Sequence, residues 1–306
     1  MNVHEWSLVI FTILAQMSVG SFIVLGVIHF FTRRAEGEEA ANRLSDRALL
    51  AIGPVLVLAM LASLFHLGNP VNAPRAVTNI GSSWLSREIM FGVLFAVLGG
   101  VFAIMQWRKM ASFSVRNIVA ILAAVAGVAL VYSMSMVYML PTQPAWNTLA
   151  TPVFFASATL LLGLFAIGAA YVANYAYVQR TDPGGAKEVR TLMSSALRWI
   201  AVAAVLVLGA ELVAIPLYLA QLSTGPAAAI ASAQMMVGDY GLFLALRIVL
   251  VFIGAGVLGF FLYHNAASPG REQILGNLAY LAFGLVLVSE VIGRYLFYVT
   301  HVRIGV

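Results

Sequence analysis

The sequence predicts an all-α integral membrane protein with eight transmembrane helices. Of its 306 residues, 62% are hydrophobic and only 9% are charged, and the mean hydropathy is +0.95, whereas soluble domains are about half apolar. Runs of about 20 apolar residues recur along the sequence, and a helix of that length crosses a bilayer. We expect one membrane domain, 1–306, whose halves 1–140 and 141–306 form two four-helix bundles.

Each predicted span is an apolar run bounded by charged residues or by Gly and Pro. In hydrocarbon every backbone polar group needs a partner within the protein, which favours helices. The separating stretches RRAEGEEAANRLSDR and QRTDPGGAKEVR are too polar to lie in the bilayer. The predicted spans are 7–31, 48–67, 88–107, 115–139, 152–178, 197–221, 240–263 and 274–299.

Basic residues are divided unevenly between the two sets of loops, and Lys and Arg in short loops stay on the cytoplasmic side. The loops after odd-numbered spans hold twelve, whereas the termini and the other loops hold three: Arg75, Arg87 and Arg303. Both termini are therefore expected outside, which for a bacterial inner membrane is the periplasm. The net charge of +5 follows from this topology and indicates no nucleic-acid partner.

The sequence contains no cysteine, so the protein holds no disulfide, iron–sulfur ligand or thiolate-bound metal. Redox chemistry would need a bound cofactor or another subunit. Haem ligation by two histidines stays open as an alternative, because His29 and His264 are both predicted at the cytoplasmic edge. The signature CxxCH of c-type haem and a Gly-rich nucleotide loop are absent from the sequence.

Few ionisable side chains fall within the spans, where each costs at least about 2.5–3.5 kcal/mol near the bilayer centre. Glu290 and Arg294 stand four apart on one helix, the spacing of a salt bridge. Glu211 is a candidate partner for Arg247 on the following span. Structural pairing is the expectation for all four. The segments LVLGAELVAI and LVLVSEVIGR place Glu211 and Glu290 at matched positions.

His66 and Glu88 bracket a loop at the outer face that Gly and Pro keep from being helical. An imidazole and a partly buried carboxylate can each accept a proton, and a hydroquinone releases two protons when it is oxidised. The alternative is a boundary histidine in solvent and a carboxylate that caps the third span. Arg75, in the same loop, is a candidate interface anchor, lipid ligand or docking residue.

Two other outer loops, 140–151 and 222–239, carry no Lys or Arg and are rich in Pro, Ala, Thr and Gln; the first contains Trp146. They are either simply short connections or a docking surface for a partner.

Several motifs together resemble the membrane anchor subunit of dimethyl sulfoxide reductase, which belongs with the quinol-interacting anchors of other molybdenum enzymes. The similarity follows the order of nearly the whole sequence. The motifs are HEWSLVIFT (4–12), SLFHLGNP (63–70), LSREI (85–89), PAWNTLATP (144–152), GAEL (209–212), DYG (239–241) followed by Arg247, and EVIGRYLFY (290–298).

The resemblance implies an eight-helix anchor with periplasmic termini, a menaquinol site near the periplasmic face, no haem and no metal site. Electrons would pass to an iron–sulfur subunit with four [4Fe-4S] clusters and then to a molybdenum bis-pterin catalytic subunit, which reduces dimethyl sulfoxide or a related S- or N-oxide. The family's quinol-linked histidine and glutamate correspond to His66 and Glu88. The family arginine after the HLG motif is replaced by Asn72, with Arg75 displaced further along.

The main hypothesis is therefore a subunit that oxidises quinol, while a separate catalytic subunit reduces the terminal substrate. Gln16 and Ser18 in the first span and Tyr138 after the fourth are expected as polar lining, and spans one to four as the slot for the quinol tail. The rival functions are a secondary transporter and a structural anchor without a quinone site. The predicted quinol-binding residues are Gln16, His66, Gly68, Arg75, Glu88 and Tyr138.

Overall fold

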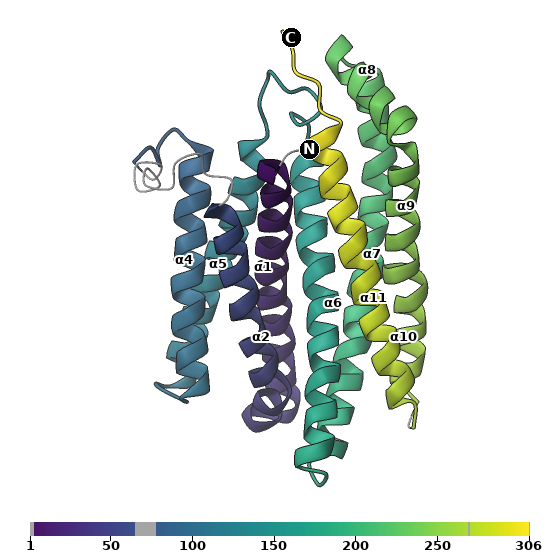
Figure 1. The fold of residues 1–306 in the computed structure, drawn as a ribbon. Helices are drawn as coiled ribbons and strands as arrows, with labels where there is room; N and C mark the ends of the chain where they lie inside the picture. Colours follow the sequence, from purple (N-terminus) through teal and green to yellow (C-terminus); the bar gives the residue numbers. More distant parts are fainter. Residues whose placement is uncertain (1–2, 65–77, 269, 306) are drawn as a thin grey trace.

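The computed structural model describes residues 3–64, 78–268 and 270–305, and within them all regular structure is helical. Eight helical spans of the described residues are long and apolar enough to cross a membrane, and they run side by side (Figure 1). The prediction of an all-α fold with eight spans is thus confirmed. The helices are α1 (Val3–Glu36), α2 (Glu38–Leu64), α4 (Trp84–Trp107), α5 (Phe113–Val137), α6 (Ala150–Thr181), α7 (Ala186–Ser223), α8 (Ala227–Gln234), η2 (Met235–Asp239), α9 (Gly241–Val251), η3 (Phe252–Val257), α10 (Leu258–Ala266) and α11 (Glu272–Val299).

Helices α1 and α6 form the centre of the molecule. Helix α1 packs against α2 and α6, and α6 also contacts α7 and α11. The two central helices approach most closely at Gly20 and Gly163, where a Cβ atom on either glycine would collide with the backbone of the other helix. Small residues allow this kind of backbone approach between membrane helices.

Helix α4 lies at the periphery and packs mainly against α5. It buries only Ser86, Phe95 and Gln106, whereas α6 buries eighteen residues. Most of α4 is therefore free to face lipid, and polar groups near its ends lie close to the protein boundary.

Charged residues at the end opposite the termini extend two helices beyond their predicted limits. Helix α2 begins at Glu38, not at residue 48, because its first turns form ion pairs with other helices. Arg116 donates to Glu38 at 2.6 Å, and Lys109 donates to Asp46 at 2.7 Å. Helix α7 likewise begins at Ala186 rather than at residue 197. An apolar run marks the part of a helix within hydrocarbon and not its full length.

The seventh span, Gly241–Ala266, consists of α9, the π-helical segment η3 and α10. The π-helical turn includes Gly254, where a Cβ atom would lie 3.0 Å from the Val286 side chain. A bulge in the middle of the span therefore brings it close to α11.

Candidate functional site

Three of the six predicted quinol-binding residues, His66, Gly68 and Arg75, lie outside the described residues. Of the other three, Gln16 lies in the first half of α1, Glu88 in the second turn of α4, and Tyr138 directly after the last residue of α5.

Glu88 lies in the second turn of α4 and is half-buried. The helix begins earlier than predicted, at Trp84, because Ser83 caps it and accepts a hydrogen bond from the Ser86 amide at 3.3 Å. The alternative that Glu88 caps this helix is therefore wrong. Arg87 donates at 2.8 Å to the carbonyls of residues 80 and 81 and stacks on Trp84. Glu88 thus lies near a helix end that Ser83 caps, and the Glu88 carboxylate takes no part in that cap.

Tyr138 follows α5 and lies in an aromatic cluster. Its hydroxyl group is 2.7 Å from that of Tyr298, and its ring contacts Trp146, Phe155 and Phe297 at centroid distances of 5.3, 5.7 and 5.2 Å. Burial, and then the charges of Tyr298 and Glu88, raise the pKa of Tyr138 well above its ordinary value. Through its hydroxyl group and its ring, Tyr138 therefore connects the end of α5 to α11.

Gln16 lies on α1 and uses both ends of its amide within the protein. Its nitrogen donates to the Phe155 carbonyl at 2.8 Å, and its oxygen accepts from Arg294 Nη2 at 2.7 Å. The guanidinium of Arg294 stacks on the Phe155 ring at 3.7 Å. Since Tyr138 packs on the same ring, Phe155 brings two of the predicted site residues together.

Tyr298 and Phe155 belong to this arrangement but were not among the predicted residues. Tyr298 ends the motif EVIGRYLFY and stands four residues after Arg294, so both lie on the same face of α11. This spacing was the available signal. No sequence signal indicated Phe155, because it takes part through its backbone carbonyl and the face of its ring.

The buried charges form one of the two expected pairs. Arg247 donates to Glu211 at 2.5 Å with Glu211 fully buried, which confirms the predicted pair between α7 and α9. The predicted pair of Glu290 with Arg294 is wrong. Arg294 bonds Gln16 instead, and one Glu290 oxygen has no hydrogen-bond partner among the described residues. The partner of Arg294 is thus the neutral amide of Gln16 on α1, and not the expected carboxylate of Glu290 on α11.

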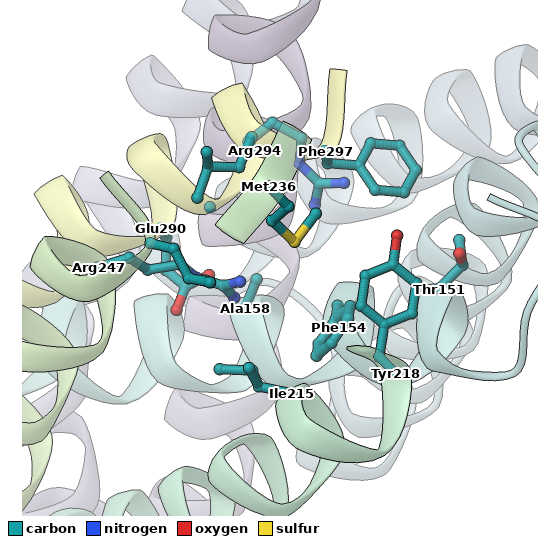
Figure 2. A pocket seen from close by; sticks show the side chains of 13 residues that line it. Thr151, Phe154, Ala158, Ile215, Tyr218, Met236, Arg247, Glu290, Arg294 and Phe297 are labelled. Atoms are coloured by element: carbon teal, nitrogen blue, oxygen red, sulfur yellow. The ribbon is translucent and has the colours of Figure 1, made fainter. Parts of the chain in front are cut away.

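A small cavity separates these charges from the aromatic side chains of α6 and α7. In Figure 2, Arg247 and Glu290 lie on one side of it, and Thr151 and Tyr218 on the other. About 40 Å³ is open to the centres of water molecules, which is room for about three of them. Unpaired nitrogen and oxygen atoms of Arg247, Glu290 and Arg294 are buried around it. The cavity therefore has room for a few water molecules beside these groups.

The terminus-bearing end is closed by segments that are far apart in the sequence. Trp146 donates to the Phe297 carbonyl at 2.7 Å and stacks on His301 at a centroid distance of 4.2 Å. The amide of Ile304 donates to the Thr142 carbonyl, and that of Val302 to Ser232 Oγ, both at 3.0 Å. The loops predicted as short connections or as a docking surface are therefore held in place by the C-terminal segment.

Eight apolar spans with a polar cluster near one end define a multi-pass membrane protein. The family described as "DMSO reductase anchor subunit (DmsC)" matches residues 1–299, and the protein belongs to this family. The resemblance drawn from the motifs is thereby confirmed.

Similar proteins match this one along its whole length. It is 30% identical to the anaerobic dimethyl sulfoxide reductase protein YnfH of Escherichia coli, over 99% of this protein and 96% of the relative. It is 28% identical to the C subunit of the anaerobic dimethyl sulfoxide reductase of Haemophilus influenzae, over 99% of this protein and 97% of the relative. A bd oxidase structure from Geobacillus thermodenitrificans has a TM-score of 0.63 at 11% identity and covers 97% of this protein and 85% of the oxidase polypeptide. This last likeness concerns the fold alone.

Proposed function

We propose that this protein oxidises menaquinol near the outer face of a bacterial inner membrane and passes the electrons to an iron–sulfur partner subunit. That subunit, with four [4Fe-4S] clusters, would deliver them to a molybdenum bis-pterin subunit that reduces dimethyl sulfoxide or a related oxide. Membership of the anchor family supports this role. The two halves of the polypeptide would form two four-helix bundles around the α1–α6 contact.

The orientation rests on charge and on the position of the termini. The loops after odd-numbered spans contain most of the Lys and Arg residues, and these are retained on the cytoplasmic side. Both termini lie together at one end of the helices (Figure 1), which is then the periplasmic end. We expect a reporter enzyme that works only in the periplasm to be active when it is fused after Val306. Activity of a reporter that works only in the cytoplasm, fused at the same place, would contradict this orientation.

The observation that carries the quinol site is the placement of Glu88. It is a half-buried carboxylate in the second turn of the peripheral helix α4, and α4 packs against α5, which Tyr138 directly follows. A quinol gives up two protons with its two electrons. Glu88 would accept one and His66 the other, while the Tyr138 hydroxyl group would orient the head group by a hydrogen bond.

The test is turnover by the assembled complex with a quinol donor and dimethyl sulfoxide as acceptor. We expect His66→Ala to abolish this turnover and Glu88→Gln to slow it about a hundredfold and change its pH–rate profile, because the proton acceptors are lost. Glu36→Gln, an exposed acid on α1, is the matched control. A viologen donor that bypasses the anchor should support full activity in every variant. Normal quinol turnover by both site variants would contradict the proposal.

A further inference from the structure

A second cavity lies deeper in the molecule, between α1, α2, α6 and α11. About 100 Å³ of it is open to the centres of water-sized spheres, more than twice the space in the charged cavity. Its walls carry no charged side chain. They include Met17, Ser18, Ala51, Ile52, Ala170 and Phe283.

The cavity exists because small side chains face it from successive helical turns. Ala48 and Ala51 on α2 lie opposite Ala166 and Ala170 on α6. The Ser18 hydroxyl group, on α1, already donates to the Leu14 carbonyl at 2.9 Å. Since a buried water needs two to four polar partners, these walls favour hydrocarbon over water.

The cavity lies at the depth of the bilayer centre and opens sideways. Ser18 and Ser21 are near the middle of the first span, and Phe283 is near the middle of the eighth. Ala51 lines the cavity and is also exposed on the outside of α2. An apolar tail that enters beside Ala51 on α2 would therefore come directly from the lipid.

The cavity adjoins the apolar cluster that contains the aromatic side chains at the outer end. Met17, Val55, Ala166 and Phe283 line it, and all four pack in the same apolar cluster as Tyr298 and its neighbour Tyr138. Phe283 lies eleven residues before Arg294 on α11, which is about 16 Å along a helix. A long, flexible tail attached to a head group near Tyr138 would reach this depth.

We propose that this cavity is the binding slot for the isoprenoid tail of the quinol. The proposal rests on the proposed quinol-oxidising function and names where the tail of that substrate lies. The walls of this slot are α1, α2, α6 and α11, whereas the sequence predicted a slot formed by spans one to four. An apolar tail held there would align the head group at the outer end.

The test compares two quinols in complexes reconstituted in nanodiscs of one lipid composition. One is menaquinol with its tail, and the other is a naphthoquinol that lacks a tail. Ala51→Phe fills the mouth of the slot, and Ala210→Phe, at an exposed position on α7, adds the same ring on another helix. We expect Ala51→Phe to raise KM about tenfold for menaquinol and less than twofold for the tail-free quinol, with Ala210→Phe unchanged.

The outcomes separate the slot from the quinol site. If the wild-type complex oxidises neither quinol, the proposed function fails. If it oxidises both, and Ala51→Phe changes both KM values alike or neither, the slot assignment is overturned.

A second measurement applies whatever the turnover. A menaquinone analogue with a photoreactive group on its tail should label peptides from the four walls, 17–21, 48–55, 166–170 or 278–287, in the wild type, and not in Ala51→Phe. Labelling elsewhere overturns the assignment. A phospholipid that co-purifies with the wild type and is lost from Ala51→Phe would also overturn the assignment, because the cavity would then hold a lipid acyl chain.

Discussion

The molecule contains two polar centres towards the end where its termini lie, and they differ in how well their charged groups are buried and paired. Around Arg247 the charges are buried and bonded to side chains from several helices, with Glu211 as an ion-pair partner. Around Tyr138 no such ion pair is present among the described residues, and both Tyr138 and Glu88, which lies on a helix that is mostly open to lipid, are half-buried. Sealed and paired charges stabilise a membrane protein, whereas a carboxylate at the boundary can exchange protons with a ligand.

The four buried charged residues differ in the partners that they find. Arg247 meets a carboxylate from the neighbouring span, while Arg294 meets Gln16 and the face of Phe155. Glu290 is left beside a cavity with room for water. The charged centre therefore carries one firm ion pair and one looser group, and variants that remove each contact test this difference.

The largest effect is expected from Arg247→Met, which leaves Glu211 buried without its partner. Removing one partner of a buried pair costs about 3–5 kcal/mol, so the variant should unfold at much lower temperature in detergent. The double variant Glu211→Met with Arg247→Met should recover most of this stability. A single variant as stable as the wild type would show that the pair contributes little.

Glu290→Gln compared with Glu88→Gln tests where the chemistry lies. Both changes keep shape and remove a carboxylate. We expect Glu290→Gln to leave quinol turnover within about twofold of wild type, against the roughly hundredfold loss expected for Glu88→Gln. Equal losses in the two variants, measured with the same quinol, would mean that the charged centre also takes part in the reaction.

Gly293→Ala should disturb the charged centre from its backbone side. A Cβ atom there would lie 2.7 Å from the Arg247 Cζ atom, so the guanidinium must move away from Glu211. Overpacking of this kind costs about 1–3 kcal/mol. Gly284→Ala, on the same helix and facing open space, is the control. Equal unfolding temperatures for the two variants would contradict the tight packing of Arg247.

Tyr298→Phe should have the smallest effect. It removes the hydroxyl group bonded to Tyr138 but keeps the ring, and a typical hydrogen bond contributes about 1 kcal/mol. The exposed Tyr132, changed to Phe, is the control. A thermal unfolding curve for Tyr298→Phe that overlays the wild type would show that the tyrosine pair does not stabilise the cluster.

Much of the fold was predictable because the bilayer imposes it. Every span needs an apolar run of sufficient length, so the eight runs identified the eight helices correctly. Helix ends were less predictable, since polar residues outside the hydrocarbon extend a helix whenever they find partners on other helices. Arg116 with Glu38 is one such contact between segments far apart in the sequence.

The contacts between the predicted site residues were not predictable from the sequence. Gln16 and Tyr138 were expected as polar lining, and the structure brings both to Phe155. The spacing of Glu290 and Arg294 favoured a pair within one helix, but the direction of the Arg294 side chain is set by Gln16, which is 278 residues away. Neutral partners on distant helices leave no signature in local spacing.

The most direct test of the central claim is a binding titration with a fluorescent quinone-analogue inhibitor. The claim is that a quinol head group binds at the outer end beside Glu88. We predict saturable binding of one inhibitor per wild-type protein, weakened at least tenfold in His66→Ala and Glu88→Gln and unchanged in Glu290→Gln. Binding that is unaffected by the first two changes, or that is lost in Glu290→Gln, would contradict the account.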